Sequence, residues 1–137
     1  MKQTKRLFLG CLASLLVLLS VSRAEGGDVD IDLTAMNSTM IYAMVFNIVN
    51  NPLQYAGQTM KLTGEYTVYP TDDPAGTIHA CLVRDAAGCC ASGLEFRLAA
   101  SQEYPPEGSE ITLIGTLALD PSEKQPIPLL ENASFIH

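Results

Sequence analysis

The sequence predicts a mainly β fold, a small five-stranded OB-like Greek-key barrel preceded by one α-helix. Two observations carry this prediction. Apolar residues before Pro52 recur at helical spacing, whereas five short segments after Pro52 alternate between apolar and polar residues and are separated by turn-forming residues. Gly64, inside the first of these segments, permits the strong bend that closure of a small barrel requires.

The N-terminal residues have the three parts of a secretory signal peptide. Basic residues come first, an apolar run over residues 7–21 follows, and the small residues Ser22 and Ala24 fit a cleavage site. We therefore expect residues 1–24 to be a signal peptide and the protein to be extracytoplasmic, either secreted or associated with the cell surface. Lipid modification of Cys11 and retention of the leader as an anchor are the alternatives.

The remainder of the chain is long enough for one small domain. We interpret the polar residues 25–37 as a linker and residues 38–137 as the helix-plus-barrel domain. Four basic and fifteen acidic residues follow the leader, which gives this part a net charge of −11. Because proteins that hold nucleic acid neutralise its phosphates with Lys and Arg, this charge argues against a nucleic-acid partner.

The helix is expected to begin near Ser38 and to end before Pro52. Ser38 or Thr39 can cap its start, since a side-chain hydroxyl accepts a hydrogen bond from a free backbone N–H of the first turn. Proline stops it, because proline cannot continue the backbone hydrogen bonding. The residues predicted to form its buried face, spaced three or four apart, are Ile41, Met44, Val45, Ile48 and Val49.

The strands are expected in five segments that alternate or run apolar between turns. Pro105-Pro106 and Pro121 separate the later ones, because proline and its neighbours disfavour regular strand pairing. The predicted strands span residues 59–69, 78–84, 94–98, 111–119 and 127–135.

Two segments carry a resemblance to known proteins. Pro52, Tyr55 and Gly57 before a strand match a pattern of many OB-like domains. The run from Cys89 to Phe96, with its Cys-Cys-x-x-Gly-x-Glu-Phe motif, resembles small exported Firmicutes proteins of unknown function. It is also similar to a Cys-Cys-Ala-Ala-Asp segment in the extracytoplasmic OB-like domain of a permease-subunit family linked to metal homeostasis. This resemblance implies a barrel fold, a metal-related role and a membrane-protein partner.

Three thiols and one imidazole lie within twelve residues, at His79, Cys81, Cys89 and Cys90. His79 and Cys81 are two apart, so on a strand they face the same side of the sheet. The turn-forming residues after them would bring Cys89 and Cys90 back toward Cys81. Three thiolates and one imidazole suit tetrahedral zinc, and an acidic neighbour such as Asp85 would orient the ligands.

The cysteines have two other interpretations. A disulfide from Cys81 to Cys89 or Cys90 would supplement the limited core of a small exported domain and would leave one thiol free. Exchange among the three sulfurs is the third interpretation, although the chain has no Cys-x-x-Cys motif on a strand-to-helix turn.

The sequence contains no motif that pairs a nucleophile with a base, such as Gly-x-Ser-x-Gly or His-Glu-x-x-His. We therefore expect a non-catalytic binding domain whose partner is a metal ion, with zinc as the leading ligand, or another small ligand. The alternative is a disulfide-stabilised OB-like interaction module. In that case tyrosines on a barrel face would contact a peptide, a glycan or a membrane-protein partner.

Overall fold

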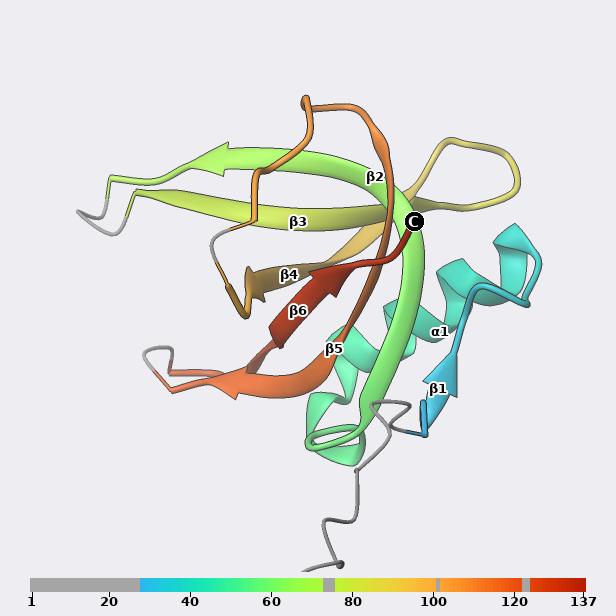
Figure 1. Ribbon diagram of the computed structural model, residues 1–137. Coiled ribbons are helices and arrows are strands. Elements are labelled where there is room, and N and C mark those ends of the chain that lie inside the picture. The colour runs from blue at the N-terminus through green and yellow to red at the C-terminus, as the bar shows by residue number, and fades with distance from the viewer. Residues whose placement is uncertain (1–27, 73–75, 101, 122–123) are drawn as a thin grey trace, which may run out of the picture.

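The computed structural model describes residues 28–72, 76–100, 102–121 and 124–137, and the expected signal peptide lies outside these ranges. The prediction of a mainly β fold is confirmed, because these described residues form one six-stranded sheet and one α-helix (Figure 1). Among the described residues, no helix has the length and apolar character needed to cross a bilayer. In chain order the elements are β1 (Ile31–Asp32), α1 (Ser38–Asn50), the 3-10 helix η1 (Pro52–Gln54), β2 (Thr59–Pro70), β3 (Thr77–Arg84), β4 (Ala91–Leu98), β5 (Glu110–Asp120) and β6 (Ile127–Phe135).

Helix α1 begins one residue after Asn37, which is its N-cap. The Asn37 backbone is extended, and its side-chain Oδ1 accepts a 3.0 Å hydrogen bond from the backbone N–H of Met40. The prediction of Ser38 or Thr39 as the cap was therefore wrong, because an amide oxygen one residue earlier already occupies that role. The predicted end is confirmed, and Pro52 follows it at the start of η1.

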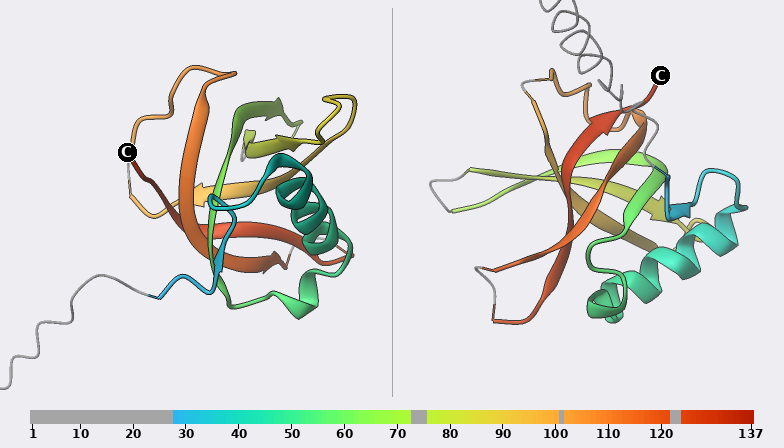
Figure 2. Two further views of the ribbon diagram at one scale, coloured as in Figure 1. Left: turned by 90° about the vertical axis from the view of Figure 1, so that its right-hand side faces the viewer. Right: turned by 60° about the horizontal axis from the view of Figure 1, so that its bottom comes forward.

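Only part of the predicted apolar face of α1 is fully covered. Val45 and Ile48 are buried in the core, whereas Ile41 and Met44 are partly buried against it. Val49 is 38% exposed, so the prediction was wrong for that residue. The helix packs against β3, β4 and β6 and lies to one side of the strands (Figure 2).

The segment interpreted as a polar linker contributes to the folded domain. Ile31 and Asp32 pair in parallel with β2, and Leu33 is fully buried in the core. Asp32 also shapes the following turn, because its Oδ1 accepts hydrogen bonds from both the backbone N–H and the hydroxyl of Thr34. The boundary of the domain therefore moves toward the N-terminus and includes these residues.

The pairings of the five longer strands close into a ring. The first half of β2 pairs antiparallel with β5 and its second half pairs antiparallel with β3. From β3 the ring continues through β4 and β6 to β5, and the β4–β6 pairing is parallel. The five predicted strand segments coincide with β2 to β6 within three residues at each end. β2 thus changes its partner midway along its length, from β5 to β3.

Gly64, the residue at which the sequence predicted a bend, lies beside the point where β2 changes partner, because the next residue, Glu65, pairs with both β3 and β5. A Cβ atom there would press into the carbonyl oxygen of Leu82 on β3 and would lie 2.8 Å from Sγ of Cys81. Only glycine lets the two strands approach this closely. The ring encloses a single apolar core, whose largest fully buried side chains include Phe96, Leu33, Met60, Leu62, Leu113, Leu117, Leu129 and Leu130.

Candidate metal centre

The loop between β3 and β4 folds back on itself between Asp85 and Cys90. The backbone N–H of Asp85 donates to the carbonyl of Cys90 at 3.0 Å, and that of Gly88 donates to the carbonyl of Asp85 at 3.0 Å. Gly88 has a φ of +69°, a conformation that glycine adopts without steric cost. The turn predicted at this position is confirmed, and it places Cys89 and Cys90 beside Asp85.

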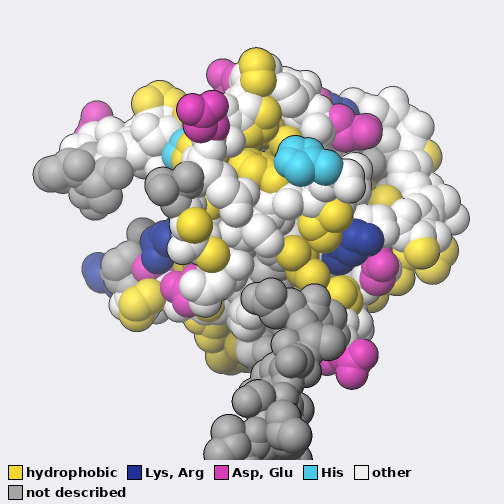
Figure 3. Space-filling model, viewed as in Figure 1, with side chains coloured by type: hydrophobic (Ala, Val, Ile, Leu, Met, Phe, Trp, Pro, Cys, Tyr) yellow, Lys and Arg dark blue, Asp and Glu magenta, His cyan; other side chains and the backbone are white. Residues whose placement is uncertain are grey.

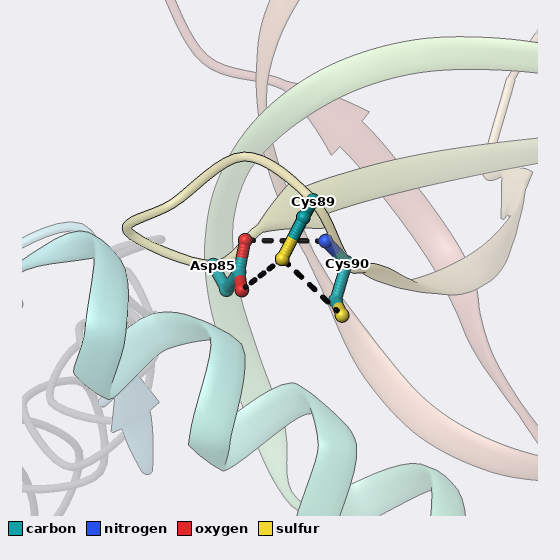
Figure 4. Close-up of side chains that lie close together, drawn as sticks. All are labelled: Asp85, Cys89 and Cys90. Atoms are coloured by element: carbon teal, nitrogen blue, oxygen red, sulfur yellow. Dashed lines mark hydrogen bonds between the residues drawn. The ribbon is translucent and has the colours of Figure 1, made fainter.

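Three side-chain groups with metal-binding chemistry converge at the base of this loop (Figure 4). The Cys89 thiol donates to Oδ2 of Asp85 at 3.3 Å, and Sγ of Cys89 lies 3.8 Å from Sγ of Cys90. The backbone N–H of Cys90 donates to Oδ1 of Asp85 at 3.2 Å. One ligand atom from each of the three residues lies within 4.8 Å of the others, so one ion can contact all three.

The hydrogen bonds in the cluster shift the pKa values of the Asp85 carboxyl group and the Cys89 thiol in opposite directions. The backbone N–H of Cys90, followed by the Cys89 thiol, lowers the pKa of Asp85 because both stabilise its carboxylate. The hydrogen bond to Asp85, followed by that to Cys90, raises the pKa of Cys89 to about 11 because it favours the protonated thiol. Without a cation, the site therefore holds one carboxylate and a neutral Cys89.

Helix α1 borders the cluster. The pKa of Tyr42, on that helix, is raised first by burial of the phenol and then by its proximity to Cys90, Asp85 and Cys89, whose ionised forms would repel a phenolate. The phenol of Tyr42 therefore lies near all three groups of the cluster. The site is framed by a loop on one side and a helix on the other, as Figure 4 shows.

Cys81 lies away from this group, in the core. It is fully buried and pairs across the sheet with Tyr66 on β2 and Leu94 on β4. Burial raises the pKa of the Cys81 thiol to about 12, because the thiolate would lose its hydration. Its side chain packs as a small hydrophobic group.

His79 belongs to a cluster of aromatic rings. Its Nδ1 lies 2.7 Å from the hydroxyl oxygen of Tyr66, and its ring stacks on Tyr104 with centroids 3.8 Å apart. Phe96 and Tyr66 contact it from the core side. Burial lowers the pKa of His79 because the charged imidazolium is desolvated. A neutral ring in this stack suits packing and hydrogen bonding.

The four predicted ligands therefore divide into two sets. Cys89 and Cys90 lie together with Asp85, while the groups of ligating side chains among the described residues include neither His79 nor Cys81. All three described cysteines are free thiols, so no disulfide from Cys81 is present in the described part of the chain. We predicted Asp85 only as a neighbour that orients the ligands. Its place at the start of an Asp-x-x-Gly turn was the signal that its side chain would reach the residues after the turn.

A cleft of about 540 Å³ lies where β2, β3 and β5 face the first turn of α1 and the segment before it. Its lining includes Arg84 and Glu65, which form an exposed ion pair at 3.4 Å, and Glu110, which lies opposite Glu65 across the β2–β5 pairing. The volume is typical of small-molecule sites, but no cysteine or histidine lines it. Among the described residues, the group of side chains able to ligate a metal therefore lies in the β3–β4 loop and not in this cleft.

Comparisons with known proteins give no further assignment. No protein-family model matches the chain, no curated protein matches it, and no solved structure matches it.

Proposed function

We propose that this protein is an exported, non-catalytic binding domain that holds zinc or another soft cation through Asp85, Cys89 and Cys90. The observation that carries the proposal is the approach of three ligand atoms, two sulfurs and one carboxylate oxygen, to within 4.8 Å of one another on an exposed loop. Thiolate sulfur binds zinc strongly, and a carboxylate oxygen is a common third ligand.

The charge of the domain favours a cation. Residues after the expected leader carry a net charge of −11, and acidic side chains are spread over the face drawn in Figure 3. Such a field raises the concentration of cations near the surface. A dication also supplies the positive charge that Cys89 needs to lose its proton beside Asp85, because bound metal lowers the pKa of a ligating thiol.

The number of protein ligands favours a site for exchangeable cargo over a structural site. Structural zinc sites are usually closed by four protein ligands, whereas three leave one position for water or for a ligand from another molecule. Asp85 is half-buried, and Cys89 and Cys90 are exposed, so that a partner has access to the ion. The apolar core forms elsewhere, inside the ring of strands, and does not include these three residues.

The remaining parts of the proposal concern the framework and the compartment. The closed ring of β2 to β6, with β2 bent at Gly64, supports an OB-like Greek-key barrel. The basic and apolar composition of residues 1–24 supports export to an extracytoplasmic place. The resemblance of the Cys89–Phe96 segment to a permease-linked domain favours a membrane protein as the partner that delivers or takes the ion.

Native mass spectrometry of the reduced full chain with added zinc tests the metal site. We expect one zinc per chain, loss of the ion in the Cys89→Ser/Cys90→Ser double variant, and weakened binding in Asp85→Asn. Cys81→Ala is the matched control, because it also removes a thiol but from a residue outside the site. Folding of each variant is checked by circular dichroism.

Two results would contradict the proposal. Absence of stoichiometric zinc, cadmium or monovalent copper from the reduced wild-type chain would remove the site altogether. Loss of the ion in both Cys81→Ala and His79→Gln, with the folds intact, would instead restore the four-ligand set predicted from the sequence.

A further inference from the structure

We propose that Cys89 and Cys90 form a reversible oxidation site, at which a small hydroperoxide joins the two sulfurs in a disulfide between neighbouring residues. The oxidation itself follows from the positions of the thiols. A second consequence, release of the bound ion on oxidation, rests on the metal site proposed above.

The two thiols are placed to react with each other. Their sulfurs are 3.8 Å apart, in van der Waals contact, and both residues are exposed to solvent and to a small oxidant. Cys81 is buried in the core and offers no alternative partner. Among the described cysteines, Cys89 and Cys90 are therefore the pair that can form a disulfide: once one sulfur is oxidised, a second thiol already lies beside it.

The product would be reduced easily, which makes the site reversible. Cα atoms of neighbouring residues are about 3.8 Å apart across a trans peptide bond, whereas disulfides usually join Cα atoms about 4.4–6.8 Å apart. The described part of the chain has no cis peptide bond, so the Cα atoms of Cys89 and Cys90 are about 3.8 Å apart, closer than most disulfides allow. A disulfide outside its preferred geometry is strained, and strained, exposed disulfides are the labile ones.

The reaction with hydrogen peroxide balances in two steps. The sulfur of one thiolate attacks a peroxide oxygen, an S–O bond forms as the O–O bond breaks, and after proton transfer the products are a sulfenic acid and water. The neighbouring sulfur then attacks the sulfenic sulfur, an S–S bond forms, and the hydroxyl leaves as a second water. The two sulfurs together lose two electrons, which the peroxide oxygens accept. A dithiol reductant returns both thiols through a mixed disulfide.

Oxidation changes the metal site because it removes both of its thiolates. A thiolate is the form of cysteine that binds metal, and neither sulfur of a disulfide is a thiolate. Asp85 alone would remain, and one exposed carboxylate does not hold zinc at low concentration. The loop would then act as a switch, in which reducing conditions favour ion binding and peroxide favours ion release.

The test uses the full chain, purified reduced and divided into zinc-loaded and metal-free samples. Each sample is exposed to hydrogen peroxide, treated with iodoacetamide, and digested for peptide mass spectrometry without reduction. We expect the peptide that contains Cys89 and Cys90 to carry no alkyl groups and to be lighter by two hydrogens than the unmodified dithiol. Dithiothreitol should restore double alkylation, and native mass spectrometry of the zinc-loaded sample should show loss of the ion.

Variants separate this reaction from non-specific oxidation. Cys81→Ala should behave like the wild type, because that thiol lies in the core. Cys89→Ser should form no disulfide within one chain and should accumulate the sulfinic acid or a disulfide between two chains at Cys90.

The outcomes distinguish the two proposals. A reversible disulfide in a protein that never bound zinc would support the oxidation site and refute both the metal site and its regulation. A second outcome is that zinc binds but neither sample forms a Cys89–Cys90 disulfide, at peroxide concentrations that oxidise Cys90 in the Cys89→Ser variant. This result would overturn the oxidation site and leave the metal site intact. A disulfide that forms while zinc remains bound would overturn the switch.

Discussion

The thiol of Cys89 donates a 3.3 Å hydrogen bond to Oδ2 of Asp85, four residues earlier in the same loop. The contact joins the one carboxylate of the site to one of its two sulfurs and keeps Cys89 protonated while the cluster is empty. The other carboxylate oxygen, Oδ1, accepts from the backbone N–H of Cys90 and holds the backbone of the second cysteine in place. Asp85 therefore organises both cysteines even before any ion arrives.

The first prediction concerns the reactivity of Cys89. Replacing Asp85 by Asn removes the negative charge and the strongest acceptor, so the pKa of Cys89 should fall from about 11 and its alkylation near pH 8 should accelerate. Rates of iodoacetamide labelling, read by peptide mass spectrometry, check this. Glu95→Gln, a charge change on β4 outside the cluster, should leave the rate unaltered. An equal Cys89 rate in wild type and Asp85→Asn would show that the hydrogen bond does not control the thiol.

The second prediction separates Cys81 from the other two cysteines. Because burial raises its pKa to about 12 and encloses the sulfur, Cys81 should resist iodoacetamide in the native protein and react only in denaturant. Cys81→Ala should lower the free energy of unfolding by about 1 kcal/mol, as expected for a small buried deletion. Labelling of Cys81 in the native state as fast as that of Cys90 would contradict its place in the core.

The third prediction is a pH dependence of stability that originates at His79. The pKa of His79 in the folded state lies below its ordinary value, because burial against Tyr66 and Tyr104 disfavours the imidazolium. In the unfolded chain the ring takes up a proton near about pH 6.5. The stability contributed by the neutral ring is therefore complete above about pH 6.5 and is lost as the pH falls through and below it.

Urea unfolding at about pH 7.5 and about pH 5.5 measures this effect. The His79→Gln variant keeps a polar group that can bond to the Tyr66 hydroxyl but cannot take up a proton in this range. Its midpoint should change less between the two pH values than that of the wild type. The same pH dependence in wild type and variant would show that another group is responsible.

The fourth prediction tests the close approach of β2 and β3 at Gly64. Gly64→Ala should lower the free energy of unfolding by about 2 kcal/mol, because its Cβ would overlap the Leu82 carbonyl and crowd the Cys81 sulfur. Thr67→Ala, three residues along the same strand, is the control and should cost less than about 1 kcal/mol. Chemical denaturation of both variants gives the comparison. An equal loss of unfolding free energy in the two variants would mean that the contact between β2 and β3 at Gly64 has room for a side chain.

Much of the fold was predictable because its signals are local. Alternation of apolar residues marked β2 to β6, and Pro52 marked the end of α1. The two-residue strand β1 was missed because two residues are too few for a periodic pattern, and only the parallel register with Met60 and Lys61 defines it. The closing of the strands into a ring depends on long-range pairing, to which Gly64 was the only local pointer.

The candidate site was predictable in part for the same reason. The two-residue spacing of His79 and Cys81 correctly put them on one face of a strand, but that face is packed, because aromatic rings cover the partly buried His79 and apolar side chains enclose Cys81. Strand spacing does not tell a ligand-lined face from a packed one. Cys89 and Cys90 return to Asp85 because β4 begins at Ala91 opposite Arg84, so the β3–β4 hairpin brings the two cysteines back beside Asp85 while Cys81 pairs farther along with Leu94.

The most direct test of the proposed site is X-ray absorption at the zinc edge of the zinc-loaded, reduced protein. A site built from Asp85, Cys89 and Cys90 should show two sulfur neighbours at about 2.3 Å, with oxygen at about 2.0–2.2 Å completing the shell. The spectrum of Cys81→Ala should be the same. Three sulfurs and an imidazole nitrogen in the wild type, with one sulfur lost in Cys81→Ala, would contradict the account and would require the core cysteine to reach the loop.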